Sequence, residues 1–198
     1  MMKLKFSTTI LCFVTILLFA SCGGSSVHNP KPRGYIRIDL PESTYVDYDT
    51  TALPFRFERN DKTTVDLKRD EKRLKWVDLR YPDLNAYIFM TYIPLEKASD
   101  LAGEVDTSYK LLSQHFEFSS GITEFLYDNK EAHVYATTYK LRGKNVASTY
   151  QFWATDSVQH FLRGSLYIDC VPNNDSLAPV LKYLHIDIDH ILETLEWK

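Results

Sequence analysis

Apolar and polar residues alternate with a period of two along most of this chain, which is the pattern of β-strands with one buried face. The segment 84–93 is apolar on both faces and rich in β-forming residues, so we expect it to be a central strand. Pro94 should end this strand because proline cannot donate to the ladder. The other predicted strands are 34–40, 54–59, 65–67, 74–81, 123–127, 132–141, 146–155 and 159–171.

Two segments change to steps of three and four residues, which predicts amphipathic helices. The first is 97–117, where Gly103 costs about 1 kcal/mol relative to alanine. The second is capped by Asp175-Ser176 and tolerates Pro179 in its first turn. Its apolar stripe consists of Leu177, Val180, Leu181, Leu184, Ile188, Ile191, Leu192 and Leu195. We expect its other, polar face to carry His185, Asp187, Asp189 and His190.

The order of these elements predicts a single α+β domain. Short turns at 142–145 and 156–157 join three long strands, which must be antiparallel neighbours because a parallel return needs a crossover of roughly a dozen residues. The charged run 66–75 is interpreted as a solvated hairpin tip. The result is an antiparallel meander covered by two amphipathic helices, since each helix needs a sheet face to bury its stripe. This order of elements resembles the Mog1/PsbP-like α/β/α sandwich.

Residues 1–21 have the features of a bacterial lipoprotein signal peptide. Two lysines precede the apolar run 10–20, which at about 1.5 Å per residue crosses only about half of a ~30 Å hydrocarbon core. Small residues then precede Cys22, although Phe19 stands where leucine is usual in a lipobox. We therefore expect a lipid anchor on Cys22, a tether at 22–33 and a folded domain at 34–198. The alternative is an ordinary secretory peptide with a coincidental cysteine.

The composition of the mature chain argues against nucleic acid as a partner. Cleavage removes Lys3 and Lys5 and leaves 21 basic against 26 acidic residues, with no basic stripe that could follow phosphates. Aromatic residues make up 14% of the sequence, with 13 Tyr and 11 Phe, which is ample for a packed core. Cys170 is the one cysteine beyond Cys22, and we expect a small buried hydrophobe rather than a nucleophile.

Signatures of catalysis or of metal binding are missing from the sequence. It has no phosphate-cradling glycine loop, no His-Glu-x-x-His and no Cys-x-x-Cys, so no cofactor, metal site or catalytic residue is predicted. His185 and His190 are five residues apart, about 140° from alignment on a helix, so they cannot share a metal. The pair His185 and Asp189 is better aligned and is interpreted as an exposed helix pair.

The densest polar cluster is 155–165, which contains Asp156, Ser157 and His160. These residue types suggest a catalytic triad, but triads are defined by geometry, and no Gly-x-Ser-x-Gly elbow surrounds either serine of the cluster. We interpret Asp156 and Ser157 as a turn closed by an Asx-type bond, and 172–176 as a loop and helix cap. Gly164 is expected to allow close packing.

Several motifs occur along the mature chain. They are the lipobox at Cys22, 32–38 (PRGYIRI), Trp76 with 81–82 (YP), 151–157 (QFWATDS), 160–162 (HFL), 164–167 (GSLY), 172–176 (PNNDS) and 193–198 (ETLEWK). Together they resemble the gliding motility lipoprotein GldD family of the Bacteroidetes, with departures at Phe19 and Glu196. The resemblance implies a cell-envelope lipoprotein needed for gliding and linked to type IX secretion, without catalytic residues to carry over.

The expected function is that of a membrane-anchored, non-enzymatic accessory protein that binds other envelope proteins. The absence of an acidic run after Cys22 favours a domain that faces the periplasm. The alternatives are an envelope small-ligand carrier, suggested by the topology, and a hydrolase that uses the 156–165 cluster. The candidate interaction surface comprises Gln151, Trp153, Asp156, Ser157, His160, Asn173 and Asn174.

Overall fold

Strand β5, Ala86–Pro94, lies in the interior of the main sheet between β4 and β9. The computed structural model describes residues 39–69 and 75–198, which belong to one compact unit, Ile36–Lys198. Side chains of β5 alternate: Ile88 and Met90 are completely buried, whereas Phe89 between them is 39% exposed on the opposite face. The prediction of a central strand ended by Pro94 is confirmed.

The described strands form two sheets, in which every neighbouring pair is antiparallel. The seven-stranded sheet has the order β3-β4-β5-β9-β8-β7-β6, with β3 Thr64–Arg69, β4 Lys75–Tyr81, β6 Gly121–Asn129, β7 Val134–Arg142, β8 Tyr150–Thr155 and β9 His160–Ile168. The three-stranded sheet has the order β1-β2-β10, with β1 Tyr45–Tyr48, β2 Phe55–Asn60 and β10 Glu196–Trp197.

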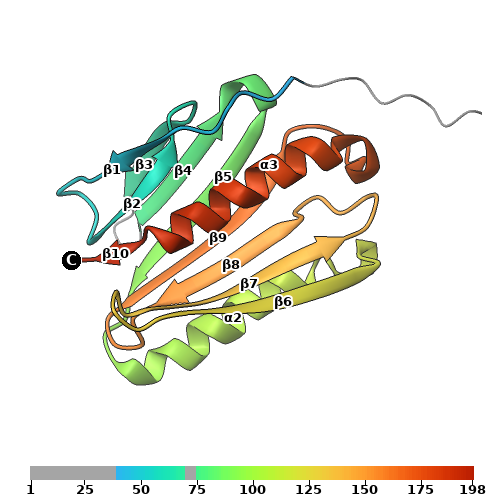
Figure 1. Cartoon of the computed structure of the whole chain (residues 1–198). Coiled ribbons are helices and arrows are strands. Elements are labelled where there is room, and N and C mark those ends of the chain that lie inside the picture. The colour runs from blue at the N-terminus through green and yellow to red at the C-terminus, as the bar shows by residue number, and fades with distance from the viewer. Residues whose placement is uncertain (1–38, 70–74) are drawn as a thin grey trace, which may run out of the picture. The chain divides into compact units, whose positions relative to one another are not determined.

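Helices α2, Leu101–Ser113, and α3, Asn174–Glu193, lie on opposite faces of the seven-stranded sheet (Figure 1). Three short 3-10 turns complete the elements of the described residues: η1 Pro82–Leu84, η2 Ala98–Asp100 and η3 Phe116–Phe118. The predicted α+β domain, an antiparallel sheet covered by two amphipathic helices, is confirmed, as are the three antiparallel neighbours β7, β8 and β9.

The main hydrophobic core lies between α3 and the sheet. Leu184 and Ile188 of α3 are completely buried and belong to the same cluster as Ile88, Met90 and Phe152 of the sheet. Burying a side chain of this size contributes about 1.5–3 kcal/mol, so this layer supplies much of the stability of the fold. The apolar stripe predicted for α3 is therefore the face that binds it to the sheet.

The other face of the sheet is covered less completely. Leu112 is the one buried residue of α2, and it packs in a small cluster with Leu141 and Val146. Since α2 buries so little, side chains of β5, β8 and β9 on this face are left partly open beside the helix.

Helix α2 is shorter than the predicted 97–117. At its start, the Asp100 N–H donates to the Lys97 carbonyl at 2.9 Å, three residues back, which closes the turn η2. At its end, the His115 N–H donates to the Leu112 carbonyl at 3.0 Å, three residues back. These tighter bonds replace the α-helical pattern at both ends.

Two predicted strands are too long. At one end of each, the backbone forms hydrogen bonds with a side chain or a loop instead of with a neighbouring strand. The predicted strand 146–155 begins only at Tyr150, since Asn174 Nδ2 donates to the carbonyls of Gly143 and Val146 at 2.7 and 2.9 Å. The predicted strand 159–171 ends at Ile168, after which the Asp169 N–H donates to the Asn85 carbonyl at 2.7 Å.

Cys170 is exposed, so the expectation of a small buried hydrophobe at this position is wrong. The reason is that the sheet ends two residues earlier, and Cys170 lies in the bend that leads to α3.

Several short elements differ from the sequence interpretation. Strands β1 and β10 were not predicted, and β6 and β7 have the bounds given above instead of 123–127 and 132–141. The run 66–75 is not all hairpin tip, because Lys68 in β3 pairs with Trp76 in β4.

The strand predicted at 34–40 lies outside the described residues except for 39 and 40, which are not in a strand. The signal peptide, the lipid site Cys22 and the tether 22–33 also lie outside the described residues and remain predictions.

The start of α3 also differs from the prediction. Asn173 is the N-cap residue, and its carbonyl accepts the N–H groups of Ser176 and Leu177 at 2.9 and 3.1 Å. The expected cap at Asp175-Ser176 is therefore wrong, and Pro179 lies in the second turn, where it removes one intrahelical bond.

The polar side of α3 is not a solvated face. Asp187 is only 1% exposed, and its carboxylate accepts hydrogen bonds from Tyr45, Tyr81 and Asn60 at 2.8–2.9 Å. The ring of His190 stacks on Tyr45, with 3.6 Å between centroids. The small sheet covers this side of the helix, so Asp187 and His190 of the predicted polar face are held by protein side chains and not by solvent.

The pair His185 and Asp189 is not the predicted exposed helix pair. His185 Nε2 lies 3.1 Å from the hydroxyl of Thr149, and Tyr150 donates to Asp189, which also forms an ion pair with Lys140 at 3.0 Å. Both side chains are partly buried because they face strands β7 and β8.

Acidification is expected to lower the stability of the fold through His185. Burial, assisted by the charge of Lys140 and opposed by that of Asp189, lowers the pKa of His185 from 6.5 to about 4. Because the pKa is lower in the folded state, the stabilisation is complete above pH 6.5 and is lost as the pH falls through 4. The urea midpoint of the protein should fall over this range.

The variant His185→Gln, which keeps a polar partner for Thr149, should show a smaller decrease. Burial also lowers the pKa of His115 and of His160, so some pH dependence should remain in the variant. The same decrease in variant and parent protein would show that His185 does not contribute.

Candidate binding groove

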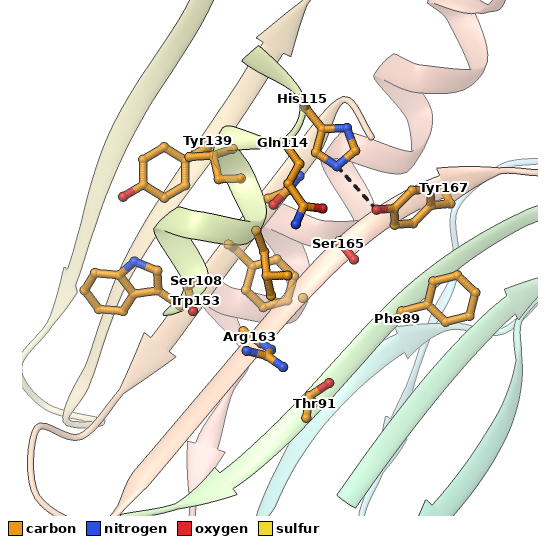
Figure 2. Close-up of a pocket in the computed structure, with 15 residues that line it drawn as sticks. Phe89, Thr91, Ser108, Gln114, His115, Tyr139, Trp153, Arg163, Ser165 and Tyr167 are labelled. Carbon is orange, nitrogen blue, oxygen red and sulfur yellow. Dashed lines mark hydrogen bonds between the residues drawn. The ribbon is translucent and has the colours of Figure 1, made fainter. Parts of the chain in front are cut away.

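A cavity of about 220 Å³ lies between α2 and the incompletely covered face of the sheet (Figure 2). It is lined by Phe89, Thr91, Ser108, Leu111, Leu112, Gln114, His115, Tyr139, Gln151, Phe152, Trp153, Arg163, Gly164, Ser165 and Tyr167. We call this cavity the α2 groove. It combines aromatic walls with several hydrogen-bonding side chains, which is the composition of a binding site.

The alternation of β8 and β9 places polar and aromatic side chains in the α2 groove. Leu162 and Leu166 of β9 face α3 and are buried, so Arg163, Ser165 and Tyr167 face the groove. The register then places Trp153 of β8 and Thr91 of β5 directly opposite Arg163. Side chains on neighbouring strands at these positions are close enough to act on one ligand.

Arg163 is the one permanently charged side chain among the residues that line the groove. It is partly buried, and among the described residues it forms no ion pair or hydrogen bond. Figure 2 shows Arg163 below Gln114, which extends from the end of α2, with Trp153 and Phe89 on either side. The ring of Trp153 stacks on Phe161, with 6.0 Å between centroids and an interplanar angle of 17°, which fixes this wall.

His115 and Tyr167 close one end of the groove. His115 Nε2 lies 3.4 Å from the hydroxyl of Tyr167, and burial lowers the pKa of His115 below its ordinary value. Burial also raises the pKa of the Tyr167 hydroxyl. Both side chains are therefore neutral near pH 7, and the groove carries the single positive charge of Arg163.

The structure divides the seven predicted surface residues among three places. Gln151 and Trp153 line the α2 groove. Asp156, Ser157 and His160 lie in and after the turn between β8 and β9. Asn173 and Asn174 lie at the start of α3, beyond the other end of β9. The seven residues therefore do not form one surface.

The turn between β8 and β9 has the predicted Asx-type closure. Asp156 Oδ1 accepts the N–H groups of Val158, Gln159 and His160 at 2.8–2.9 Å. Burial alone would raise the pKa of Asp156, but these backbone bonds outweigh it and hold the pKa below its ordinary value. Ser157 has a left-handed φ of 69°, which a tight turn requires.

His160 is held by aromatic side chains and not by Ser157. Its Nδ1 lies 2.9 Å from the Tyr92 hydroxyl, and its ring stacks on Trp197 with 5.1 Å between centroids. Within the described part of the chain, no hydrogen bond joins Ser157 to His160, and Asp156 contacts the backbone of His160 instead of its ring.

The two asparagines have local structural contacts. Asn174 fixes the 143–146 loop through its side-chain amide, as described above. Asn173 Nδ2 lies 3.0 Å from the hydroxyl of Ser176 in the first turn of α3. These bonds agree with the sequence interpretation of 172–176 as a loop and helix cap.

Gln114 and Phe89 are groove residues that the sequence interpretation missed, and Arg163 lies in the 155–165 cluster but was not among the seven candidate residues. An arginine between Leu162 and Gly164, inside an otherwise apolar strand, was the available signal. Such an arginine indicates that the face of the sheet opposite the core is at least partly polar. The position of α2 beside it could not be read from the pattern.

A second hollow of about 630 Å³ lies between α3 and β7. Its basic side chains are Lys140, Arg142, Lys144 and Lys182, and Lys140 is already paired with Asp189. Many of its lining residues are exposed, including Lys144, Lys182 and Ile186, so it is an open depression and encloses a ligand less well than the α2 groove. Among the described residues, no group of three or more His, Cys, Asp or Glu side chains is placed to hold a metal ion.

Comparison with known proteins identifies a family and similar solved structures. The sequence model of the family described as gliding motility lipoprotein GldD matches residues 25–197. No curated protein matches the chain. One similar structure is the solution structure of cyanobacterial PsbP (CyanoP) from Synechocystis sp. PCC 6803, with 12% identity, a TM-score of 0.49, and coverage of 82% of this chain and 98% of that chain.

Proposed function

The chain belongs to the gliding motility lipoprotein GldD family, and from this premise we propose that it is a non-enzymatic accessory protein of gliding motility and type IX secretion. It is anchored by lipid on Cys22, faces the periplasm, and acts by binding other envelope proteins through its folded domain. The family match over residues 25–197 is the observation that carries this proposal.

The N-terminal sequence supports the anchor. A short apolar run ends in small residues before Cys22, and the following residues 23–26 contain no acid. None of the helices in the described part of the chain is long and apolar enough to cross a membrane. Attachment of two or more acyl chains would hold such a domain stably at a membrane surface.

The contacts of the polar clusters support a binding role in preference to hydrolysis. A serine nucleophile needs a base within hydrogen-bonding reach. His160 is instead held by Tyr92 and Trp197, and His115 in the α2 groove is paired with Tyr167. The groove therefore offers recognition groups without an activated nucleophile among the described residues.

The size of the α2 groove supports protein binding in preference to ligand carriage. Its volume of about 220 Å³ is smaller than the roughly 300–1,000 Å³ of pockets that enclose small-molecule ligands. The wider hollow beside α3 is too open to bury most of a ligand surface. A groove of this size suits one anchoring residue of a larger partner.

Deletion of the gene tests the proposal. In a strain that glides and secretes cargo by the type IX pathway, loss of the protein should leave cargo in the periplasm and reduce it in the medium. Cargo should be quantified in both compartments, with an outer-membrane protein of another export route as the control. Normal secretion in the deletion strain would contradict the secretion role.

A further inference from the structure

We propose that the α2 groove binds the C-terminal residue of another envelope protein, with Arg163 as the partner of its terminal carboxylate. This inference rests on the proposed function, because it names the chemistry of the partner that an accessory protein of this kind would bind.

The charge of the groove favours an anionic ligand. Arg163 is partly buried without an ion pair, and no acid lines the groove. The acids of β3 and β4 on the same face, Asp66 and Asp78, lie 3.0 and 3.7 Å from Lys68 and leave Arg163 unpaired. A guanidinium in this setting favours a planar anion that it can bind with two parallel hydrogen bonds.

The polar and aromatic groups around that charge favour a ligand with an apolar side chain beside its carboxylate. Thr91 and Trp153 flank Arg163 on the two neighbouring strands, and Gln114, at the end of α2, lines the groove above it (Figure 2). Phe89, which is 39% exposed, forms an apolar wall at the other side. An apolar C-terminal residue carries its carboxylate and its side chain on one carbon, so it uses the charge and the wall together.

The volume of the groove limits the ligand to a chain end. A cavity of about 220 Å³ accommodates roughly one residue, and its open side lets a chain continue outward. An internal segment would have to enter and leave the groove, and an acidic side chain alone would leave the aromatic wall unused. A terminal residue needs only one opening for its chain and can place a side chain against the aromatic wall. Binding of a terminal carboxylate by protein groups is an established mode of peptide recognition.

Fluorine NMR of the full-length lipidated protein, in micelles of an uncharged detergent, tests this inference. With 5-fluorotryptophan, three resonances are expected, from Trp76, Trp153 and Trp197, and Trp153→Phe assigns the groove signal. The probe is the hexapeptide acetyl-Ser-Gly-Ser-Gly-Ala-Phe with a free carboxylate. It should shift the Trp153 signal, whereas the same peptide with a C-terminal amide should bind at least tenfold more weakly.

Two variants distinguish an effect of the Arg163 charge on binding from an effect on folding. Arg163→Gln should weaken binding of the free-acid peptide at least tenfold, while Arg80→Gln, an exposed arginine on β4 of the same sheet face, should bind within twofold of the parent. Unchanged signals of Trp76 and Trp197 would show that each variant is folded.

Equal binding of the acid and the amide, or no shift of Trp153 with either peptide, would overturn the inference without requiring any variant. Stronger binding of an amidated peptide with an internal glutamate would also overturn it and assign the groove to side-chain carboxylates. These outcomes are independent of the deletion strain, in which normal secretion would overturn the proposed function instead.

Discussion

Replacing Asp187 with alanine is expected to lower the free energy of unfolding by about 2–6 kcal/mol, because the change leaves two buried donors without their acceptor, at about 1–3 kcal/mol each. Asp187 is 1% exposed, and no basic side chain in the described part of the chain pairs with it. Its two oxygens accept from Tyr45, Asn60 and Tyr81, and these donors come from three different strands.

The tyrosines remain protonated donors over the whole physiological range. Burial, assisted by hydrogen bonding to Asp187 and by its charge, raises the pKa of Tyr45 to about 12. Burial and the same carboxylate raise the pKa of Tyr81 still further. In the alanine variant the buried Tyr81 hydroxyl and one N–H of Asn60 would lose their acceptor, at a cost of about 1–3 kcal/mol for each unsatisfied group, whereas the Asn60 amide keeps the Tyr183 hydroxyl at 2.7 Å and Tyr45 is only partly buried.

Urea unfolding at pH 7 measures this effect. Asp187→Asn should be intermediate, because the amide keeps one acceptor oxygen but turns a donor toward other donors. Asp175→Ala is the matched control, since Asp175 is an exposed carboxylate on the same helix and should cost no more than about 1 kcal/mol through the helix dipole. A loss at Asp187 no larger than that at Asp175 would show that the network is not stabilising.

Replacing Gly164 with alanine is the second change with a large expected effect. A Cβ at this position would lie 2.3 Å from Cζ of Phe152, whose ring is 2% exposed in the core. The ring and the sheet must move to accommodate it, and overpacking of this kind costs about 1–3 kcal/mol.

Gly103→Ala is the matched control for Gly164→Ala. Gly103 lies inside α2, and a Cβ at this position would meet nothing within 4 Å, so alanine should stabilise the protein by roughly 0.5–1 kcal/mol. Opposite shifts in the urea midpoint are therefore expected from the same substitution. A shift of the same sign and size in both variants would contradict the packing of Phe152 against Gly164.

The sequence pattern was sufficient for elements that bury a regular apolar face. Strand β5 was predicted because its segment is rich in β-forming residues and apolar on both faces, and helix α3 because its apolar residues repeat every three to four residues. Gly164 was assigned correctly to close packing, since a glycine inside a strand often marks such an approach.

Asp187 shows why the polar side of α3 was misinterpreted. A carboxylate opposite the apolar stripe of a helix is normally solvated, so the pattern favours exposure. Its donors Tyr45 and Tyr81 are 142 and 106 residues away in sequence. They come from β1 of the small sheet and β4 of the main sheet. Only the tertiary arrangement shows that they converge on this carboxylate.

The α2 groove could be predicted in part. The alternation of β8 and β9 indicates that Trp153 and Arg163 share a face, but it does not indicate how much of that face a helix covers. Because α2 buries only Leu112 completely, the neighbouring side chains stay accessible, and this depends on packing that periodicity does not specify.

Complementation of the deletion strain tests the central claim of a non-enzymatic accessory role most directly. The strain would carry either the parent gene or a gene with Ser157→Ala and His160→Gln, which removes the serine hydroxyl and the titratable ring from the 156–165 cluster. Type IX cargo would be measured in medium and periplasm, and immunoblots would confirm equal amounts of the lipoprotein. Both genes are expected to restore secretion; failure of the double variant at normal abundance would contradict the accessory role and favour an envelope hydrolase.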